Sequence, residues 1–175
     1  MPDPESSPFT LRPASLADIP QLLDLIRGLA EYERLMHLFE CTAERLEQAL
    51  FGQAPSAHAL IAWPRPPASA EAAGVALYFH NFSTFLGRRG LYLEDLFVRP
   101  KYRGQGCGQA LLTALARHAH DLGCGRFEWS VLDWNTSAQR FYEKLGATVL
   151  PDWRIVRLTG EPLARLAAKR PGGTL

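Results

Sequence analysis

Apolar side chains recur at helical spacing in three parts of the chain, which predicts three amphipathic helices. The first helix is expected from Ser15 to about Glu31, and the second from Thr42 to about Leu50. The third follows a glycine-rich stretch and stops at Gly123. The inward faces of these helices consist of leucine, isoleucine and alanine residues: Leu22, Leu25, Ile26 and Leu29; Leu46 and Leu50; Leu111, Leu115, Ala119 and Leu122.

Runs of β-branched, aromatic and leucine residues, bounded by proline or glycine, predict strands between these helices. A strand before the third helix and another after it form a strand–helix–strand unit, and such units place parallel strands side by side. A short terminal helix is expected from Glu161 to Lys169. The expected strands are residues Phe9–Arg12, Ala59–Trp63, Gly74–Phe82, Leu91–Val98, Arg126–Asp133 and Asp152–Leu158.

A glycine-rich stretch joins the strand ending at Val98 to the third helix. It reads Arg103-Gly104-Gln105-Gly106-Cys107-Gly108, with glycine at every second position, so several backbone N–H groups can turn toward one anion without an intervening Cβ. The helix that follows adds unpaired N–H groups and the positive end of its dipole. The stretch is therefore suited to bind a pyrophosphate, although a solvent-exposed loop is the plainer interpretation of the glycines.

Two well-known phosphate motifs do not fit this stretch. A dinucleotide fingerprint of the G-x-G-x-x-G kind would need glycine at position 109, where the chain has Gln109. A P-loop would need a G-K-[ST] ending, and none follows. Nucleotide binding of those two kinds is therefore not indicated.

Acidic and aromatic residues stand out at three further places. Glu94 and Asp95 lie inside an otherwise apolar strand, and Glu31-Tyr32-Glu33 closes the first helix, where a solvated face is the plainer interpretation. Asn135 and Tyr142 are seven residues apart, which is two helical turns, so both project from one helix face. Asn135 is also a favoured helix cap, and a purely structural role for both stays open.

Composition narrows the class of protein. A chain of 175 residues with 47% hydrophobic content can bury the core of one domain. A net charge of +1 gives no reason to expect nucleic acid or an anionic membrane as a partner. The three cysteines have no C-x-x-C spacing and the five histidines are scattered, so we expect neither a disulfide framework nor a metal site, but a cytoplasmic location.

The motifs resemble those of a known family. The arginine-x-x-glycine-x-glycine pattern of Arg103, Gly106 and Gly108 is similar to the acyl-CoA pyrophosphate loop of the GNAT N-acetyltransferases. The tract from Trp134 to Ala147 resembles their second signature, in which an asparagine begins a helix and a tyrosine follows on it. Together with the Tyr32-Glu33 and Glu94-Asp95 pairs, these tracts look like the diamine (spermidine/spermine) N-acetyltransferases and their thialysine-acetylating relatives, over about residues 11–166.

The resemblance implies a fold. It is an α/β domain with a mixed, mostly antiparallel sheet of six or seven strands and helices on both faces. The sheet would split between the 91–98 and 126–133 strands, and the active site would lie at the split. We expect one such domain over residues 9–170, between a disordered tail at 1–8 and a second tail at 171–175, and the family implies a homodimer.

Acetyl transfer to an amine needs three groups: one to take the ammonium proton, one to hold the thioester oxygen and one to protonate the leaving thiolate. Glu94 is placed to accept the proton, directly or through a water molecule. A backbone N–H of residues 96–98 would polarise the carbonyl. Tyr142, with an unperturbed pKa near 10, is suited to protonate the sulfur, as in the family. No Cys-His or Ser-His-Asp order stands out, which favours direct attack over an acylated Cys107.

The family also implies which residues bind the two substrates. A substrate with several ammonium groups needs carboxylates along a groove and aromatic faces for cation–π contact. The expected acceptor residues are Tyr32, Glu33, Glu94, Asp95, Asp152 and Trp153. The expected acetyl-CoA residues are Leu96, Phe97, Val98, Arg103, Gly104, Gln105, Gly106, Cys107, Gly108, Gln109, Asn135, Ser137 and Tyr142.

The predicted function is therefore acetyl-CoA-dependent, metal-free N-acetylation of a small cationic amine, such as a polyamine, a diamine or a thialysine-like amino acid. The alternative is a GNAT-fold module that binds CoA or a metabolite and regulates or bridges partners, because fold alone does not establish activity.

Overall fold

The chain forms two compact units, Met1–Ser130 and Val131–Leu175. The computed structural model describes residues 7–65 and 71–169. The predicted tail at 171–175, and all of the tail at 1–8 except Ser7 and Pro8, therefore lie outside the described residues. The prediction of one domain over residues 9–170 stays a prediction.

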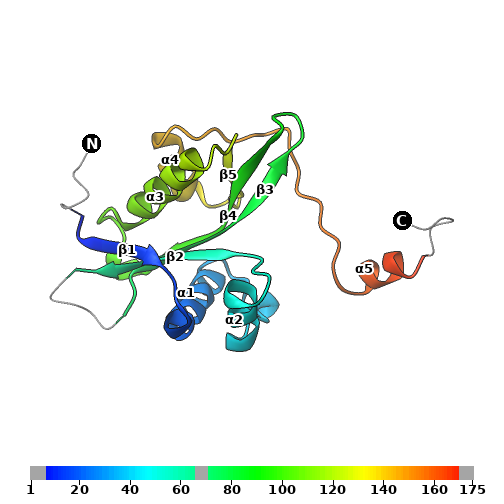
Figure 1. The fold of residues 1–175 in the computed structure, drawn as a ribbon, viewed down its shortest axis with the longest axis horizontal. Helices are drawn as coiled ribbons and strands as arrows, with labels where there is room; N and C mark the ends of the chain where they lie inside the picture. Colours follow the sequence, from blue (N-terminus) through cyan, green and yellow to red (C-terminus); the bar gives the residue numbers. More distant parts are fainter. Residues whose placement is uncertain (1–6, 66–70, 170–175) are drawn as a thin grey trace. The chain divides into compact units, whose positions relative to one another are not determined.

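The first unit contains a mixed sheet of five strands in the order β1-β2-β3-β4-β5 (Figure 1). The strands β1 to β4 pair antiparallel with their neighbours, and β5 pairs parallel with β4. The parallel pair is the one that the strand–helix–strand pattern predicted, because only a crossover helix can bring two strands together in the same direction. The strands are β1 (Phe9–Pro13), β2 (His58–Pro64), β3 (Gly74–Ser83), β4 (Arg88–Val98) and β5 (Phe127–Trp129).

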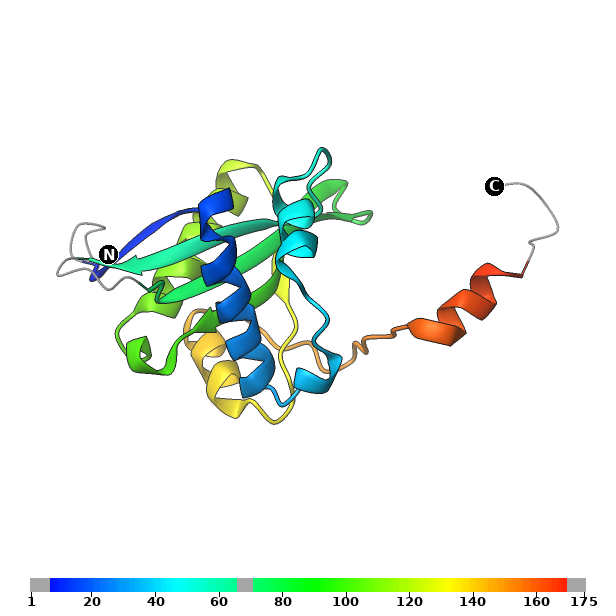
Figure 2. The same cartoon turned by 90° about the horizontal axis from the view of Figure 1, so that it is seen from below.

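Helices cover both faces of this sheet. The helices α1 (Ile19–Tyr32) and α2 (Ala43–Phe51) lie on one face, and α3 (Cys107–Asp121) lies on the other (Figures 1 and 2). All three predicted helices are confirmed within a few residues. Most of the predicted apolar stripes are buried: Leu22, Leu25, Leu46 and Leu50 pack on one face, and Leu111, Leu115 and Ala119 are buried on the helix at the other. Ile26 and Leu29 are partly buried, and the prediction was wrong for Leu122, which lies just beyond the end of α3 and is exposed.

Two features fix the ends of α1. A 3-10 turn, η2 (Leu16–Asp18), precedes the helix, and Asp18 forms a capping box with Ser15 and an ion pair with Arg12 at 2.6 Å. At the other end Arg34 takes a left-handed conformation with φ 62°, which stops the helix at Tyr32. Tyr32 and Glu33 therefore sit at a defined helix end.

A β-bulge interrupts the pairing of β3 with β4. Leu77 pairs with Asp95, but the next residue, Tyr78, pairs with Leu93, so Glu94 is an extra residue on β4. A bulge shifts the alternation of side chains along a strand. The residue before the bulge, Leu93, lies on the α3 face, because its partner Tyr78 contacts His118 of α3. After the bulge, Phe97 packs in the core beside α1 and α2, and Asp95, two residues away, shares that face.

The strand predictions need two corrections. The strand expected over Arg126–Asp133 is only three residues long, and the stretch Asp152–Leu158 forms no strand. The sheet in the described residues therefore has five strands instead of six or seven. The β-branched, aromatic and leucine residues at 152–158 indicate local strand propensity, but a strand exists only where a neighbour takes up its backbone hydrogen bonds.

The second unit contains two helices, α4 (Thr136–Lys144) and α5 (Gly160–Ala167). The stretch between them includes exposed apolar side chains, with Trp153 75% and Val156 93% exposed. The predicted helices at 135–142 and 161–169 are thus present.

Candidate active site

The glycine-rich stretch forms the connection from β4 to α3. A short 3-10 turn, η4 (Pro100–Tyr102), comes first, and Gly106 caps the N-terminus of α3. Gly104 and Gly106 have φ values of 72° and 85°, which other residues adopt only with strain. A Cβ built on either glycine would meet nothing within 4 Å, so this side of the loop is open. With the N–H groups of the first turn of α3, this geometry fits a bound pyrophosphate.

Cys107, the first residue of α3, is buried and unsuited to covalent catalysis. Its side chain is 1% exposed, and its Sγ lies near the backbone of β3, 3.4 Å from where a Cβ on Gly74 would stand. Burial raises the pKa of the thiol to about 12, so the nucleophilic thiolate is suppressed at neutral pH. This agrees with direct attack by the amine.

Arg103 extends from the same loop to the α1 side of the sheet. Its Nε donates a hydrogen bond of 2.9 Å to the carbonyl oxygen of Val98. Its Cζ lies 4.6 Å from the centroid of the Tyr32 ring and 5.6 Å from that of Phe97. The side chain thus joins the predicted coenzyme loop to a residue predicted for the acceptor.

Three of the predicted acceptor carboxylates influence one another. The bulge gives Glu94 and Asp95 adjacent places near the end of α1, where Glu33 follows Tyr32. Burial, together with the charges of Glu94 and Glu33, raises the pKa of Asp95 to about 7. Burial also raises the pKa of Glu33. These three carboxylates concentrate negative charge in the first unit, as the binding of a cationic substrate would require.

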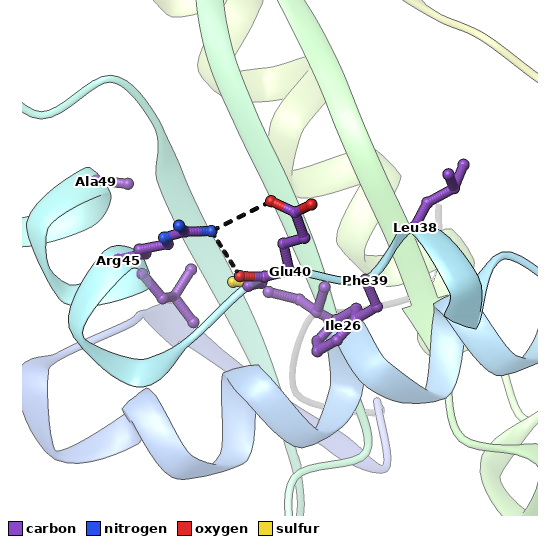
Figure 3. Close-up of a pocket in the computed structure, with 8 residues that line it drawn as sticks. Ile26, Leu38, Phe39, Glu40, Arg45 and Ala49 are labelled. Atoms are coloured by element: carbon purple, nitrogen blue, oxygen red, sulfur yellow. Dashed lines mark hydrogen bonds and ion pairs between the residues drawn. The ribbon is translucent and has the colours of Figure 1, made fainter. Parts of the chain in front are cut away.

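Sequence reasoning missed a shallow pocket of about 450 Å³ between α1 and α2 (Figure 3). Across it, Nη1 of Arg45 donates a hydrogen bond of 2.9 Å to the carbonyl oxygen of Glu40. Cys41 lines this pocket and is influenced by one of the acidic residues. Burial and the charge of Asp95 both raise the pKa of its thiol. The signal in the sequence was the apolar pair Leu38-Phe39 between two helices. The pocket is lined by Ile26, Leu38, Phe39, Glu40, Cys41, Arg45, Leu46 and Ala49.

Sequence reasoning also missed a histidine cluster on the α3 face. His80 and His118 have ring centroids 6.0 Å apart, His58 lies 6.2 Å from His80, and Tyr78 contacts all three. Residues that are isolated in sequence meet here because β2, β3 and α3 are neighbours. Within residues 7–65 and 71–169, no group of three or more His, Cys, Asp or Glu side chains could hold a metal ion.

The edge of β4 that faces β5 is paired only as far as the residue before the bulge. Pairing with β5 covers only Leu91–Leu93, whereas β4 continues to Val98. In the described part of the chain, no strand pairs with this edge of β4 beyond Leu93. Backbone groups alternate between the two edges of a strand, so those of residues 96–98 that do not pair with β3 point to this unpaired edge. Of these, the Val98 carbonyl binds Arg103.

The remaining predicted residues belong to the second unit. Asn135 caps α4: its Oδ1 accepts hydrogen bonds from the Ala138 N–H at 3.3 Å and from the Ser137 hydroxyl at 3.1 Å. Tyr142 lies on the same helix, with its ring centroid 5.4 Å from that of Phe141. Trp153 is exposed, and Nη1 of Arg154 donates to the carbonyl oxygens of Pro151 and Trp153. The predicted roles of Asn135, Ser137, Tyr142, Asp152 and Trp153 stay predictions.

Comparison with known proteins decides the family. The model of the acetyltransferase (GNAT) family matches residues 22–147, which include the bulge, the glycine loop and α4. The chain belongs to the GNAT acetyltransferase family. The predicted fold class and the prediction of an N-acetyltransferase enzyme are both confirmed.

Two curated relatives of this GNAT protein show which activities occur among similar chains. An L-ornithine N5-acetyltransferase from Arabidopsis thaliana, NATA1, is 36% identical, and the match covers 91% of each chain. A thialysine N-epsilon-acetyltransferase from Bos taurus is 39% identical, with 91% of this chain and 97% of that protein covered. The resemblance to thialysine-acetylating enzymes seen in the sequence is thereby confirmed.

A solved structure supports the fold of the GNAT chain independently. The integron cassette protein VCH_CASS6 from V. cholerae superimposes with a TM-score of 0.77 at 23% identity, covering 94% of this chain and 100% of the other. Such a match shows the architecture alone.

Among the helices of the described ranges, none has the length and apolarity needed to cross a membrane.

Proposed function

We propose that this protein transfers an acetyl group from acetyl-CoA to a primary amine of a small cationic acceptor, either a diamine-bearing amino acid or a polyamine. The single observation that carries the proposal is the bulge that brings Glu94 and Asp95 together beside Glu33, at the point where β5 stops pairing with β4. GNAT enzymes use acetyl-CoA as the acetyl donor, and the relatives named above act on amino acids that carry an additional amine.

The acidic residues would hold the acceptor and deprotonate it. An ammonium group near Asp95 would oppose the burial and the repulsion that raise its pKa, so binding would release a proton from this carboxyl. Glu94 is exposed and can accept the proton of the attacking amine, directly or through water. Tyr32, Glu33, Asp152 and Trp153 are proposed to complete the acceptor site.

The coenzyme would be held by backbone groups. The loop from Arg103 to Gln109 fits its pyrophosphate, and the strand edge at Leu96, Phe97 and Val98 can bind its pantetheine arm and polarise the thioester carbonyl. From the family resemblance we assign Asn135 and Ser137 to the same ligand, and we assign Tyr142 to protonation of the departing thiolate. No metal is needed for these steps, because the proton transfers and the charge stabilisation come from protein groups.

The direct test is a thiol-release assay with acetyl-CoA and a panel of putrescine, spermidine, spermine, ornithine, thialysine and lysine. We expect CoA release that depends on at least one of these amines. A protein that binds CoA but releases none with any amine would be the regulatory or bridging module instead. The homodimer and the cytoplasmic location remain proposals, which light scattering and cell fractionation would check.

A further inference from the structure

Arg103 has more contacts with the acceptor side of the first unit than a phosphate ligand requires. Its guanidinium lies over the rings of Tyr32 and Phe97, and its Nε is held by the carbonyl oxygen of Val98. All three partners lie outside the glycine loop, on α1 and β4. The side chain is therefore fixed by the elements that carry the acceptor carboxylates.

The C-terminal end of α1 favours a nearby positive charge. Carbonyl groups at a helix C-terminus carry partial negative charge, which basic residues in the last turn usually offset. The last turn of α1 contains no basic residue, and Arg103 lies against Tyr32, the final residue of the helix. Arg103 thus supplies from the coenzyme loop a positive charge that the last turn of α1 lacks.

The position of this helix end matters for the acidic residues. Glu33 follows Tyr32 directly, and its charge acts on Asp95. The helix is also pressed closely to β4, since a Cβ on Gly28 would lie 2.9 Å from the Phe97 ring. A shift of Tyr32 would move Glu33 relative to Glu94 and Asp95, and with it the groups proposed to hold the amine.

We propose that Arg103 is a positioning residue that couples the coenzyme loop to the acceptor site. Through its contacts with Tyr32 and Val98 it holds the end of α1 against β4, so that a loop ordered by coenzyme favours the geometry that binds the amine. This inference rests on the proposed function. Because coupling between two ligands is reciprocal, the acceptor must also strengthen CoA binding by the same factor.

The first test separates positioning from phosphate binding by steady-state kinetics. Arg103→Gln is expected to raise the KM for the acceptor roughly threefold to tenfold, the range of a cation–π contact with a partly buried ring. The dissociation constant for CoA, measured by calorimetry without acceptor, is expected to rise by a smaller factor than the acceptor KM, because the coenzyme is proposed to be held by backbone N–H groups of the loop, which the substitution keeps. A large loss of CoA affinity with an unchanged acceptor KM would show a phosphate ligand and overturn the proposal.

Matched variants control this test. Lys101→Gln removes a cation two residues earlier, from a side chain that pairs with Glu71, and is expected to leave the acceptor KM unchanged. Tyr32→Leu is expected to reproduce the Arg103→Gln effect, Tyr32→Phe to keep most of the wild-type value, and the double variant Arg103→Gln with Tyr32→Leu to be no worse than either single one. Additive single effects would exclude coupling through the Tyr32 ring.

A second readout does not depend on turnover. In the free protein, Arg103→Gln is expected to speed hydrogen exchange at the amides of residues 29–33, while those of α2 keep their protection. Unaltered exchange at the end of α1 would contradict the positioning role even if the acceptor KM rose. If the wild type acetylated no amine, the proposed function would fail, and this exchange measurement would still test the contact.

Discussion

At the scale of single residues, the environment of Asp95 differs most from what its residue type suggests. A carboxyl group in water titrates near 3.9, but burial and the charges of Glu94 and Glu33 bring the pKa of Asp95 to about 7. The sequence showed two adjacent acids on a strand, and ordinary alternation would have sent them to opposite faces. The bulge, which depends on how β3 and β4 pair, interrupts this alternation at Glu94.

The raised pKa predicts a pH-dependent stability. The folded state holds the Asp95 proton more tightly than the unfolded state, so the free energy of unfolding falls as pH rises from about 4 to about 7, and the ionised group is destabilising above that range. Asp95→Asn should therefore raise the Tm relative to wild type by several degrees more at pH 8 than at pH 5. Thermal unfolding in two buffers measures this.

Glu47→Gln serves as the control for this comparison, because it removes an exposed carboxyl on α2. Its effect on Tm should be the same at both pH values. An equal Tm difference at pH 5 and pH 8 for Asp95→Asn would show that Asp95 ionises normally in the folded protein.

At the scale of elements, the connection from β4 to α3 is the part whose structure agrees best with the prediction from the sequence. The glycine spacing predicted a loop that needs residues without a Cβ and a helix after it. Gly104 and Gly106 have positive φ values, and Cys107 begins α3. This was possible because the required φ values are local properties of the chain. The helices were predictable for the same reason, since their apolar stripes repeat every three to four residues.

The loop geometry makes a second prediction. Gly106→Val places a side chain on the open side of the loop and should weaken CoA binding at least tenfold, about 1.4 kcal/mol, in a calorimetric titration. Gly87→Val is the matched control, because Gly87 also has a positive φ of 60° and open space around it but lies before β4. Both variants should lose similar stability, so equal CoA affinities would place the pyrophosphate elsewhere.

At the scale of the whole molecule, sequence reasoning succeeded where one segment determines its own structure and failed where two segments must meet. The strand predicted at Asp152–Leu158 is absent, and β5 ends at Trp129 instead of Asp133, because strand length depends on the partner edge. The histidine cluster and the pocket near Arg45 arise from neighbouring elements and left no periodic signal. The family resemblance supplied the fold that local patterns alone could not.

The central claim is that Glu94, set by the bulge beside Asp95, takes the proton of the attacking amine. The most direct measurement is the pH dependence of kcat/KM for wild type and Glu94→Gln with the best amine of the panel. We expect the variant to be at least tenfold slower near pH 7 and to recover as rising pH deprotonates the free amine, since one general base typically contributes about 10²–10⁴-fold. Identical pH profiles for the two proteins would contradict the account.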